Sequence, residues 1–418
     1  MTIKQEIVDF RQRFKWSHTF TALRSRNYRL WFFGQMVSLF GTWMQITAQG
    51  FLVFQLTHSP VYLGYVAFAS GIPTWLFMLY AGVVADRMSR RRLLLVTQTA
   101  MMILAFILAG LTFLKLVQPW HIILLAFGLG VANAFDAPAR QAFVLEMVER
   151  EDLTNAIALN STMFNSATAF GPAIAGVTYA LFGPAWCFTL NGISFIAVIA
   201  ALLAMMNLNP QPIQEEQNSV LVDLKEGLSY VLSHPMIRTL LGLVGMITLF
   251  GISFATLIPA WTIRILHGNA SVNGLLFSAR GLGALISALS IASLGRFKFK
   301  GKLLTLGTFA FPVGLLAFAL VRRTPLSLLA LVGVGWASIL IFNLANTLVQ
   351  TLASDKLRGR VMSVYSFTFF GFMPIGGLLA GAVAEKAGEP ATVILWSLIL
   401  LGSAASIWIF LPKIRELE

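Results

Sequence analysis

The sequence predicts an all-α polytopic membrane protein with twelve transmembrane helices in two six-helix pseudo-repeats. Of its 418 residues, 57% are hydrophobic and only 11% are charged, whereas about a quarter of an ordinary soluble domain is charged. The apolar residues gather in twelve long runs, and about 20 apolar residues in a helix cross the roughly 30 Å hydrocarbon core of a bilayer. The two halves of the chain also resemble each other. These three observations exclude a soluble fold.

The first six runs predict the helices of an N-terminal half, residues 1–206, which begins with a basic tail. The tail has no long apolar core followed by a cleavage site, so it is not a removable signal peptide. We therefore expect it to stay in the cytoplasm. The six runs cover residues 30–56, 61–85, 93–114, 120–143, 157–182 and 185–206.

The second six runs follow a polar break at residues 207–236, which holds Pro210, Pro212, Glu215 and Glu216. Such a composition is typical of a linker, here a cytoplasmic one between two halves. The C-terminal half, residues 237–418, carries runs at 237–263, 272–294, 303–321, 326–350, 361–384 and 392–411.

A short motif repeats between the halves. The fifth run contains Gly171-Pro172-Ala173-Ile174-Ala175-Gly176, and the eleventh contains Gly376-Gly377-Leu378-Leu379-Ala380-Gly381. Two parallel repeats joined by a central loop are a transporter architecture, in which the substrate binds between the repeats near the bilayer midplane. The repeat therefore favours alternating access over a channel, which stays open as another class.

The lysine and arginine residues predict which helix ends face the cytoplasm. Placing both termini inside puts 24 of the 30 in cytoplasmic segments and five outside, with Arg280 within a span. Cytoplasmic loops keep the positive charge, so the reverse topology is disfavoured. We attribute the net charge of +13 to contact with an anionic lipid bilayer and not to nucleic acid. We expect a multi-pass protein of the inner or plasma membrane.

The loop after the second run carries a basic motif, Gly82-Val83-Val84-Ala85-Asp86-Arg87-Met88-Ser89-Arg90-Arg91-Arg92. A small residue such as Gly82 lets helices approach closely, and Asp86 can accept hydrogen bonds from a helix N-terminus. The motif resembles the cytoplasmic signature of the major facilitator superfamily, with Ser89 in place of the usual second glycine. The alternative is a stop-transfer cluster of charges.

This resemblance implies a gating role for the loop. In the superfamily the aspartate faces the start of the eleventh span, here near Gly359 to Val361, and the arginine pairs with an acid after the fourth span, here Glu146. The candidate gating residues at this end are Gly82, Asp86, Arg87, Arg90 and Glu146.

The fifth span contains a second motif, Ala167 followed by Gly171-Pro172 and by Ala175-Gly176. Small residues permit tight helix packing and proline kinks a helix. The pattern resembles an exporter signature of the superfamily with two glycines replaced by alanine, so Gly171, Pro172 and Gly176 join the gating candidates. Ordinary small-residue packing is the alternative.

Three further segments resemble a subgroup that holds enterobactin-type siderophore exporters and macrolide efflux proteins. They are Arg26 to Phe32, Asn133 to Gln141 and Asn155 to Ser161. The resemblance covers nearly the whole chain and implies a proton-driven exporter. One departure weakens the proton-relay scheme of some relatives, because Leu124 stands where many drug-proton antiporters have an arginine.

Asp136 is the one carboxylate of seventeen that lies inside an apolar span. A charge at the bilayer centre costs about 2.5–3.5 kcal/mol, so it needs a function or a partner. Two interpretations are open: Asp136 carries the coupled proton, or it is neutralised by Arg140 one helical turn away. Both residues are therefore proton-coupling candidates.

Other polar residues inside the spans predict a substrate cavity. Arg280 is the basic side chain well inside a span, where it either contacts anionic parts of a substrate or extends toward the outer surface. Polar stripes at helical spacing face a cavity or another helix, not lipid. The predicted cavity residues are Gln35, Ser38, Thr42, Gln45, Gln49, Asn133, Arg280, Asn343 and Asn346, with Gln350 continuing the last stripe.

Absent motifs narrow the class. The chain has no phosphate-binding loop of the Gly-x-x-x-x-Gly-Lys-Ser/Thr type, so transport is secondary. One cysteine, Cys187, excludes an internal disulfide, and all five histidines lie in tails, loops or span ends. We therefore expect no metal, no cofactor and no enzyme activity.

The sequence thus predicts a monomeric, proton-coupled exporter of a hydrophobic or amphipathic small molecule, such as a drug, a macrolide or a siderophore. A lipid or lysolipid flippase, or an importer of the same superfamily, is the alternative.

Overall fold

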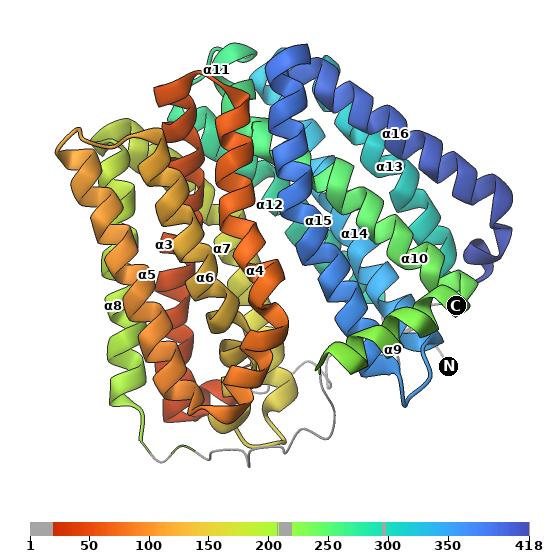
Figure 1. Ribbon diagram of the computed structural model, residues 1–418, viewed down its shortest axis with the longest axis horizontal. Helices are drawn as coiled ribbons and strands as arrows, with labels where there is room; N and C mark the ends of the chain where they lie inside the picture. Colours follow the sequence, from red (N-terminus) through yellow and green to blue (C-terminus); the bar gives the residue numbers. More distant parts are fainter. Residues whose placement is uncertain (1–19, 207, 209–219, 295–297, 418) are drawn as a thin grey trace, which may run out of the picture.

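The computed structural model describes residues 20–206, 208, 220–294 and 298–417, which form a bundle of helices (Figure 1). No β-strand occurs within these ranges. The predicted all-α class is therefore confirmed for the described chain.

The first half of the bundle consists of six long helices. Three of them begin with a proline at or next to their first residue, where the missing N–H would have had no intrahelical acceptor. After the short η1 (Thr21–Arg24) come α3 (Arg26–Thr57), α4 (Pro60–Arg87), α5 (Arg90–Phe113), α6 (Pro119–Phe143), α7 (Leu153–Phe182) and α8 (Pro184–Ala204), with η2 (Val144–Glu146) after α6.

The second half begins with a helix inside the predicted linker, α9 (Val220–Ser233). Tyr230 of this helix accepts a hydrogen bond from the backbone N–H of Ser354, so α9 packs on the second half. The remaining helices are α10 (Pro235–Met246), α11 (Ile258–Arg264), α12 (Ala270–Leu294), α13 (Lys300–Leu320), α14 (Thr324–Leu352), α15 (Arg358–Ala387) and α16 (Glu389–Phe410), followed by η5 (Pro412–Glu416).

The seventh predicted span is not a regular helix. Between α10 and α11 the chain passes through a π-turn, η3 (Ile247–Gly251), and a 3-10 segment, η4 (Ile252–Leu257). Pro259, which follows, has no N–H to donate to the preceding turn. Such an interruption inside a helix often marks a functional site or hinge.

Eleven helical segments of the described chain are long and apolar enough to cross a membrane. A multi-pass membrane protein is thereby confirmed. Helix α7 is not among the eleven, because its first half carries the polar residues Asn155, Asn160, Ser161, Thr162 and Asn165. The arrangement of twelve spans in two repeats therefore stays a prediction.

Each half buries its own core. Apolar side chains between Val231 and Ile414 form one cluster, and those between Ala22 and Met205 form another. In Figure 1 the helices α3 to α8, red to yellow-green, lie on one side, and α10 and α13 to α16 lie on the other. A further buried cluster extends across the contact between the halves, because it contains Val53 and Tyr179 of the first half together with Ala260 and Ala270 of the second.

Candidate functional site

Two helix pairs make the main contacts between the halves, α4 with α15 and α7 with α12; we call them the seams. Glycines allow the backbones to touch. A Cβ atom on Gly274 of α12 would lie 2.9 Å from Gly176 Cα of α7, and one on Gly381 of α15 would lie 3.0 Å from Gly64 Cα of α4. Gly176 and Gly381 both belong to the motif that repeats in the sequence. The repeated motif thus marks the contact between the halves.

The seams hold the halves together at one end only. The α4–α15 seam reaches as far as Trp75 and Phe367, whose ring centroids are 5.1 Å apart, and beyond it Leu76 and Tyr80 are 59% and 62% exposed. The α7–α12 seam reaches Gly281, which packs on the backbone of Thr168. Figure 1 shows the two groups of helices meeting at the top and diverging toward the bottom. We call these the latch end and the open end.

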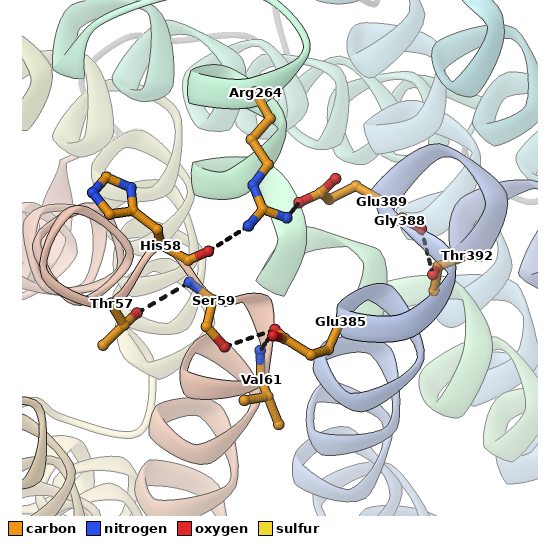
Figure 2. Close-up of polar contacts among 9 residues, drawn as sticks. All are labelled: Thr57, His58, Ser59, Val61, Arg264, Glu385, Gly388, Glu389 and Thr392. Carbon is orange, nitrogen blue, oxygen red and sulfur yellow. Dashed lines mark hydrogen bonds and ion pairs between the residues drawn. The ribbon is translucent and has the colours of Figure 1, made fainter.

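Arg264 is the centre of a polar cluster at the latch end (Figure 2). Its Nη1 donates to Glu389 Oε1 at 3.0 Å, and its Nη2 donates to the carbonyl oxygen of His58. The guanidinium also lies over the Phe54 ring, 5.2 Å from its centroid. Arg264 therefore links α3 of the first half to α11 and α16 of the second.

Glu385 makes a second link between the halves at this end (Figure 2). Its Oε2 accepts hydrogen bonds from Ser59 Oγ at 2.6 Å and from the Val61 backbone N–H at 3.4 Å. Ser59 precedes α4, so the carboxylate lies at the N-terminus of that helix, where its negative charge is favourable. We call His58, Ser59, Val61, Arg264, Glu385 and Glu389 the polar latch.

At the open end, ion pairs form within one half. Arg90 Nη1 lies 3.0 Å from Glu146 Oε1, the contact that the superfamily resemblance implied. Arg360 pairs with Asp223 Oδ1 at 2.8 Å and with Glu226, which joins α15 to α9.

Two other residues of the predicted gating loop lie at the end of α4. The side chain of Asp86 is outside the described part of the chain, so its expected position near Gly359 to Val361 stays a prediction. Arg87 is the last residue of α4 and is exposed.

The structure corrects one expectation about the gating glycines. A Cβ atom on Gly82 would meet no atom within 4 Å, so Gly82 does not bring helices together in this conformation, because it lies on α4 beyond the end of its seam. The glycines of α7 do lie in contacts: a Cβ on Gly171 would be 2.8 Å from Trp43 Cβ of α3, and Gly274 packs on the Pro172 carbonyl.

Asp136 lies in a buried cluster between α6 and α5. Its side chain is 1% exposed, and its Oδ1 accepts from Thr97 Oγ1 at 2.9 Å and from Gln98 Nε2 at 2.8 Å. Oδ2 has no hydrogen-bond partner and lies 3.7 Å from Arg140 Nε. The structure thus brings the two proton-coupling candidates together, and it adds Thr97 and Gln98 as partners.

The polar stripe of the first span is mostly buried inside the first half. Gln35, Ser38, Gln45 and Gln49 are at most 6% exposed, and Gln45 Oε1 accepts from Asn191 Nδ2 of α8 at 2.7 Å. Gln45 thus contributes to helix packing in this conformation, the alternative to a cavity wall, while Gln35 Oε1 is buried without a hydrogen-bond partner among the described residues. Thr42 is half-buried.

Asn133 and the stripe of α14 are more exposed than the stripe of the first span, and their place in a cavity stays a prediction. Asn133 is exposed, and at 100° per residue it lies opposite the exposed Trp120, Leu124 and Phe127 of the same helix, the face expected to contact lipid. On α14, Asn343 and Gln350 are exposed and Asn346 is half-buried. Gln350 Nε2 donates to Asn346 Oδ1 at 2.6 Å.

Arg280 lies on α12 at the level where the α7–α12 seam ends. The next residue, Gly281, packs on the Thr168 backbone of α7, and the Arg280 backbone itself packs on Gly335 of α14. Its side chain is half-buried. Arg280 therefore lies between the two halves and not in the latch.

Sequence reasoning missed the polar latch and a stripe on α7. Ser161, Asn165 and Thr168 follow steps of four and three, and Ser161 and Thr162 are exposed; the spacing rule that found the other stripes would have found this one. Glu385 and Glu389 are four residues apart in the sequence, on either side of the break between α15 and α16. They flank Lys386, one of the few basic residues predicted to lie outside the cell. That proximity was the available signal for the latch.

Comparisons with known proteins agree with this architecture. Residues 17–418 match the family model described as transmembrane secretion effector, MFS_3. The staphyloferrin A transporter of Staphylococcus aureus is 27% identical over 361 residues, 86% of this chain and 90% of its own. The multidrug efflux pump Tap of Mycolicibacterium fortuitum is 28% identical over 397 residues, 90% and 94%. The enterobactin exporter EntS of Citrobacter koseri is 26% identical over 364 residues, 85% of each chain.

Solved structures share the fold. A mutant of the nucleoside transporter NupG superposes with a TM-score of 0.73 at 15% identity, covering 93% of this chain and all of that one. A POT family transporter gives 0.72 at 12% identity, covering 93% and 97%. The predicted superfamily is confirmed: the chain belongs to the transmembrane secretion effector family of the major facilitator superfamily, whose members are membrane transporters and not enzymes.

Proposed function

We propose that this protein is a secondary active exporter of hydrophobic or amphipathic small molecules that works by alternating access. One observation carries the proposal: the halves are joined at the latch end and diverge at the open end, where polar side chains of α7 and α14 are exposed. A lipid-facing surface would not leave such groups uncovered. The described conformation then corresponds to the state that loads its substrate from the open side.

The proposal includes twelve spans in two repeats. Helix α7 is the twelfth span, because its polar residues face the interior and not lipid. The moving bodies are residues 1–206 and 237–418, and residues 207–236 link them, with helix α9 of this link packed on the second body. One chain supplies the whole path, so the functional unit is a monomer.

The relatives support the class of substrate. Their names include a siderophore transporter, a multidrug efflux pump and a siderophore exporter. Drugs and siderophores are small molecules, and two of the three named relatives move them outward.

Coupling to protons completes the proposal. Asp136 Oδ2 lies beside Arg140 without a hydrogen-bond partner, so this oxygen can take a proton while Oδ1 keeps its two donors. Protonation would remove the charge that holds Arg140 and free its guanidinium. Each charge that moves through 100 mV supplies about 2.3 kcal/mol, enough for roughly a fiftyfold gradient.

The orientation follows from the charge distribution, with both termini and the open end in the cytoplasm of an inner or plasma membrane. A reporter fused after Glu418 or within residues 214–219 should then report the cytoplasm. Extracellular signals from both fusions would overturn this orientation.

Uptake into inside-out membrane vesicles tests export directly. With an imposed proton gradient, vesicles that contain the protein should accumulate a macrolide, a siderophore or a lysolipid faster than vesicles without it. A variant with cysteines at Val61 and Glu385, cross-linked across the latch, should bind substrate but not move it. Equal accumulation in all vesicles would overturn the proposal, and uptake in right-side-out vesicles alone would identify an importer.

A further inference from the structure

We infer that Arg280 is the anchor of an anion-binding site between the halves, and that the transported molecule is an organic anion. The inference deepens the proposed function and rests on it. It assigns a chemical class to the substrate, because a guanidinium recognises a carboxylate, a phenolate or a phosphate through paired charge-assisted hydrogen bonds.

The first argument concerns the contacts of the Arg280 side chain. Among the described residues, none makes a hydrogen bond or ion pair with its side chain, whereas Arg90, Arg140 and Arg264 each lie beside a carboxylate. An unpaired charge in the interior of a membrane protein is costly, and such residues mark substrate or ion pathways. The missing partner of Arg280 is therefore expected to come from outside the chain.

The second argument is the direction that Arg280 takes from its helix. The exposed apolar residues of α12, Leu275, Leu282, Ile286 and Leu289, share one face. At 100° per residue, Arg280 lies about 120–160° from the first three of them. The guanidinium therefore leaves the helix away from lipid and toward the space between α7 and α14.

The third argument is access. Arg280 is half-buried. Its nitrogen atoms are not among the fully buried side-chain atoms that lack a hydrogen bond. It lies where the α7–α12 seam stops, so a solute entering from the open end meets it before the closed part of the seam. Asn343 of α14 lies eight residues beyond Gly335, about 12 Å along the helix toward the open end.

The same face of α12 holds two more polar groups without partners. Asn273 and Ser287 are seven residues before and after Arg280, which places all three on one side of the helix. Asn273 is 1% exposed and Ser287 is 0% exposed, and Asn273 Oδ1 and Ser287 Oγ make no hydrogen bond. Within the described chain, polar atoms of three residues on one side of α12 thus lack a hydrogen-bond partner, which is expected of a helix that exchanges partners during transport.

Charge in the interior is positive overall. Arg140 of α6 is 25% exposed, while its counter-ion Asp136 is 1% exposed and turned toward α5. Arg140 lies seven residues after Asn133 and so shares its face, opposite the expected lipid side. A solute between the halves therefore meets guanidinium groups and neutral polar groups, an environment that attracts anions.

A binding assay with matched acid and amide probes tests the inference. Full-length protein is placed in nanodiscs of phosphatidylcholine, and the affinities for 1-naphthoate and 2,3-dihydroxybenzoate are compared with those for their neutral amides. The wild type should bind the acids at least roughly tenfold more tightly, as expected for a charge-assisted hydrogen bond in a desolvated site. Arg280→Gln should abolish this preference, Arg280→Lys should keep part of it, and Arg323→Gln, an exposed arginine at the start of α14, should leave it unchanged.

Stability is the second measurement. Because Arg280 has no partner, Arg280→Gln should leave the Tm unchanged or raise it. A lowered Tm would reveal a structural partner and would overturn the inference, as would an unchanged preference for acids in Arg280→Gln. A wild type that responds to phosphatidylglycerol in the nanodisc but to neither acid would identify a lipid headgroup as the occupant and would also overturn it.

Failure of the inference and failure of the proposed function give different results. If the vesicles accumulate neutral amphipathic molecules and the acids bind no more tightly than the amides, export is supported and the anion site is overturned. If the acids bind through Arg280 and no tested molecule accumulates in the vesicles, the anion site is supported and the proposed export is overturned.

Discussion

The two ends of the bundle are held by different kinds of contact. At the latch end, Arg264 with Glu389 and His58, and Ser59 with Glu385, join one half to the other. At the open end, the ion pairs of the described residues stay within one half, as in Arg90 with Glu146. In the alternating access that we propose, contacts between halves would break, whereas contacts within a half would persist in both states.

The strength of each contact follows its burial. In each pair the carboxylate is buried: Asp136 is 1% exposed, Glu146 is 9% exposed and Glu389 is 4% exposed. The arginines differ more, at 25% exposed for Arg140, 13% for Arg90 and 41% for Arg264. Breaking a buried pair is expensive, while an exposed pair contributes about 0–1 kcal/mol. The latch arginine is the most exposed partner of the three pairs, so we expect the latch pair to break more easily than the two pairs within the first half. Four predictions test this ranking, from the largest expected effect to the smallest, and a fifth separates the two interpretations of Asp136.

Asp136→Ala should lower the free energy of unfolding by about 3–5 kcal/mol, because it removes the acceptor of Thr97 and Gln98 and leaves Arg140 without its counter-ion. Chemical denaturation in detergent measures the effect. Asn133→Ala, on the same helix but exposed, is the control and should change the free energy by at most about 0.5 kcal/mol. A similar change in the free energy of unfolding for the two variants would show that Asp136 makes no stabilising buried contact.

A milder change separates the two interpretations of Asp136. If it carries the coupled proton, Asp136→Asn should abolish uphill export and permit downhill exchange, because the amide mimics the protonated carboxyl. If it only neutralises Arg140, the double variant with Arg140→Gln should restore much of the uphill export. Uphill export by the double variant would eliminate Asp136 as the proton site.

Arg90→Ala should lower the free energy of unfolding by about 1–3 kcal/mol, because it leaves the Glu146 carboxylate buried without its partner. Folded protein should remain in the membrane, and both this variant and Asp86→Asn should impair transport at matched expression. Membrane yield and vesicle uptake measure the two effects. Normal transport by both variants would show that the charges of the loop after α4 set the membrane topology and play no part in gating.

Glu389→Gln combined with Ser59→Ala should shift the conformational equilibrium by about 1–2 kcal/mol toward opening of the latch end, roughly a 5- to 30-fold change in population. The readout is the labelling rate of Ser271→Cys, at the latch end of α12, by an impermeant maleimide. Cys187 is fully buried and should not react. Lys386→Gln, a change at an exposed residue of the same end, is the control and should leave the labelling rate unchanged. A labelling rate in the double variant equal to that without the double change would show that Glu389 and Ser59 do not hold the latch end closed.

Asp355→Asn should change the free energy of unfolding by less than about 0.5 kcal/mol. Asp355 is 90% exposed beside Arg358, so solvent screens the pair. Thermal unfolding measures the effect. A loss above 1 kcal/mol would break the ranking by burial on which the comparison depends.

Apolar runs in the sequence predicted most of the long helices, because their length and hydrophobicity follow from the thickness of a bilayer. They did not predict α9 or the interruption of the seventh span. The sequence also predicted the contact of Arg90 with Glu146 through the family resemblance. It was less successful for the stripe of the first span: Gln45 packs on Asn191, because a polar stripe satisfies its hydrogen bonds equally well against a helix or a cavity. Periodicity shows that a face is polar, but not what it faces.

The sequence by itself determined the all-helical membrane fold, the family and the two residues whose charge lies inside the spans, because each depends on local composition and spacing. Only the tertiary structure decided what those charges contact. It placed Asp136 among Thr97, Gln98 and Arg140, and it gave Arg280 no hydrogen bond or ion pair with another described residue. It also joined Ser59 to Glu385 across 326 positions of the chain, because a hydrogen bond depends on which helices meet and the spacing within one helix carries no such information.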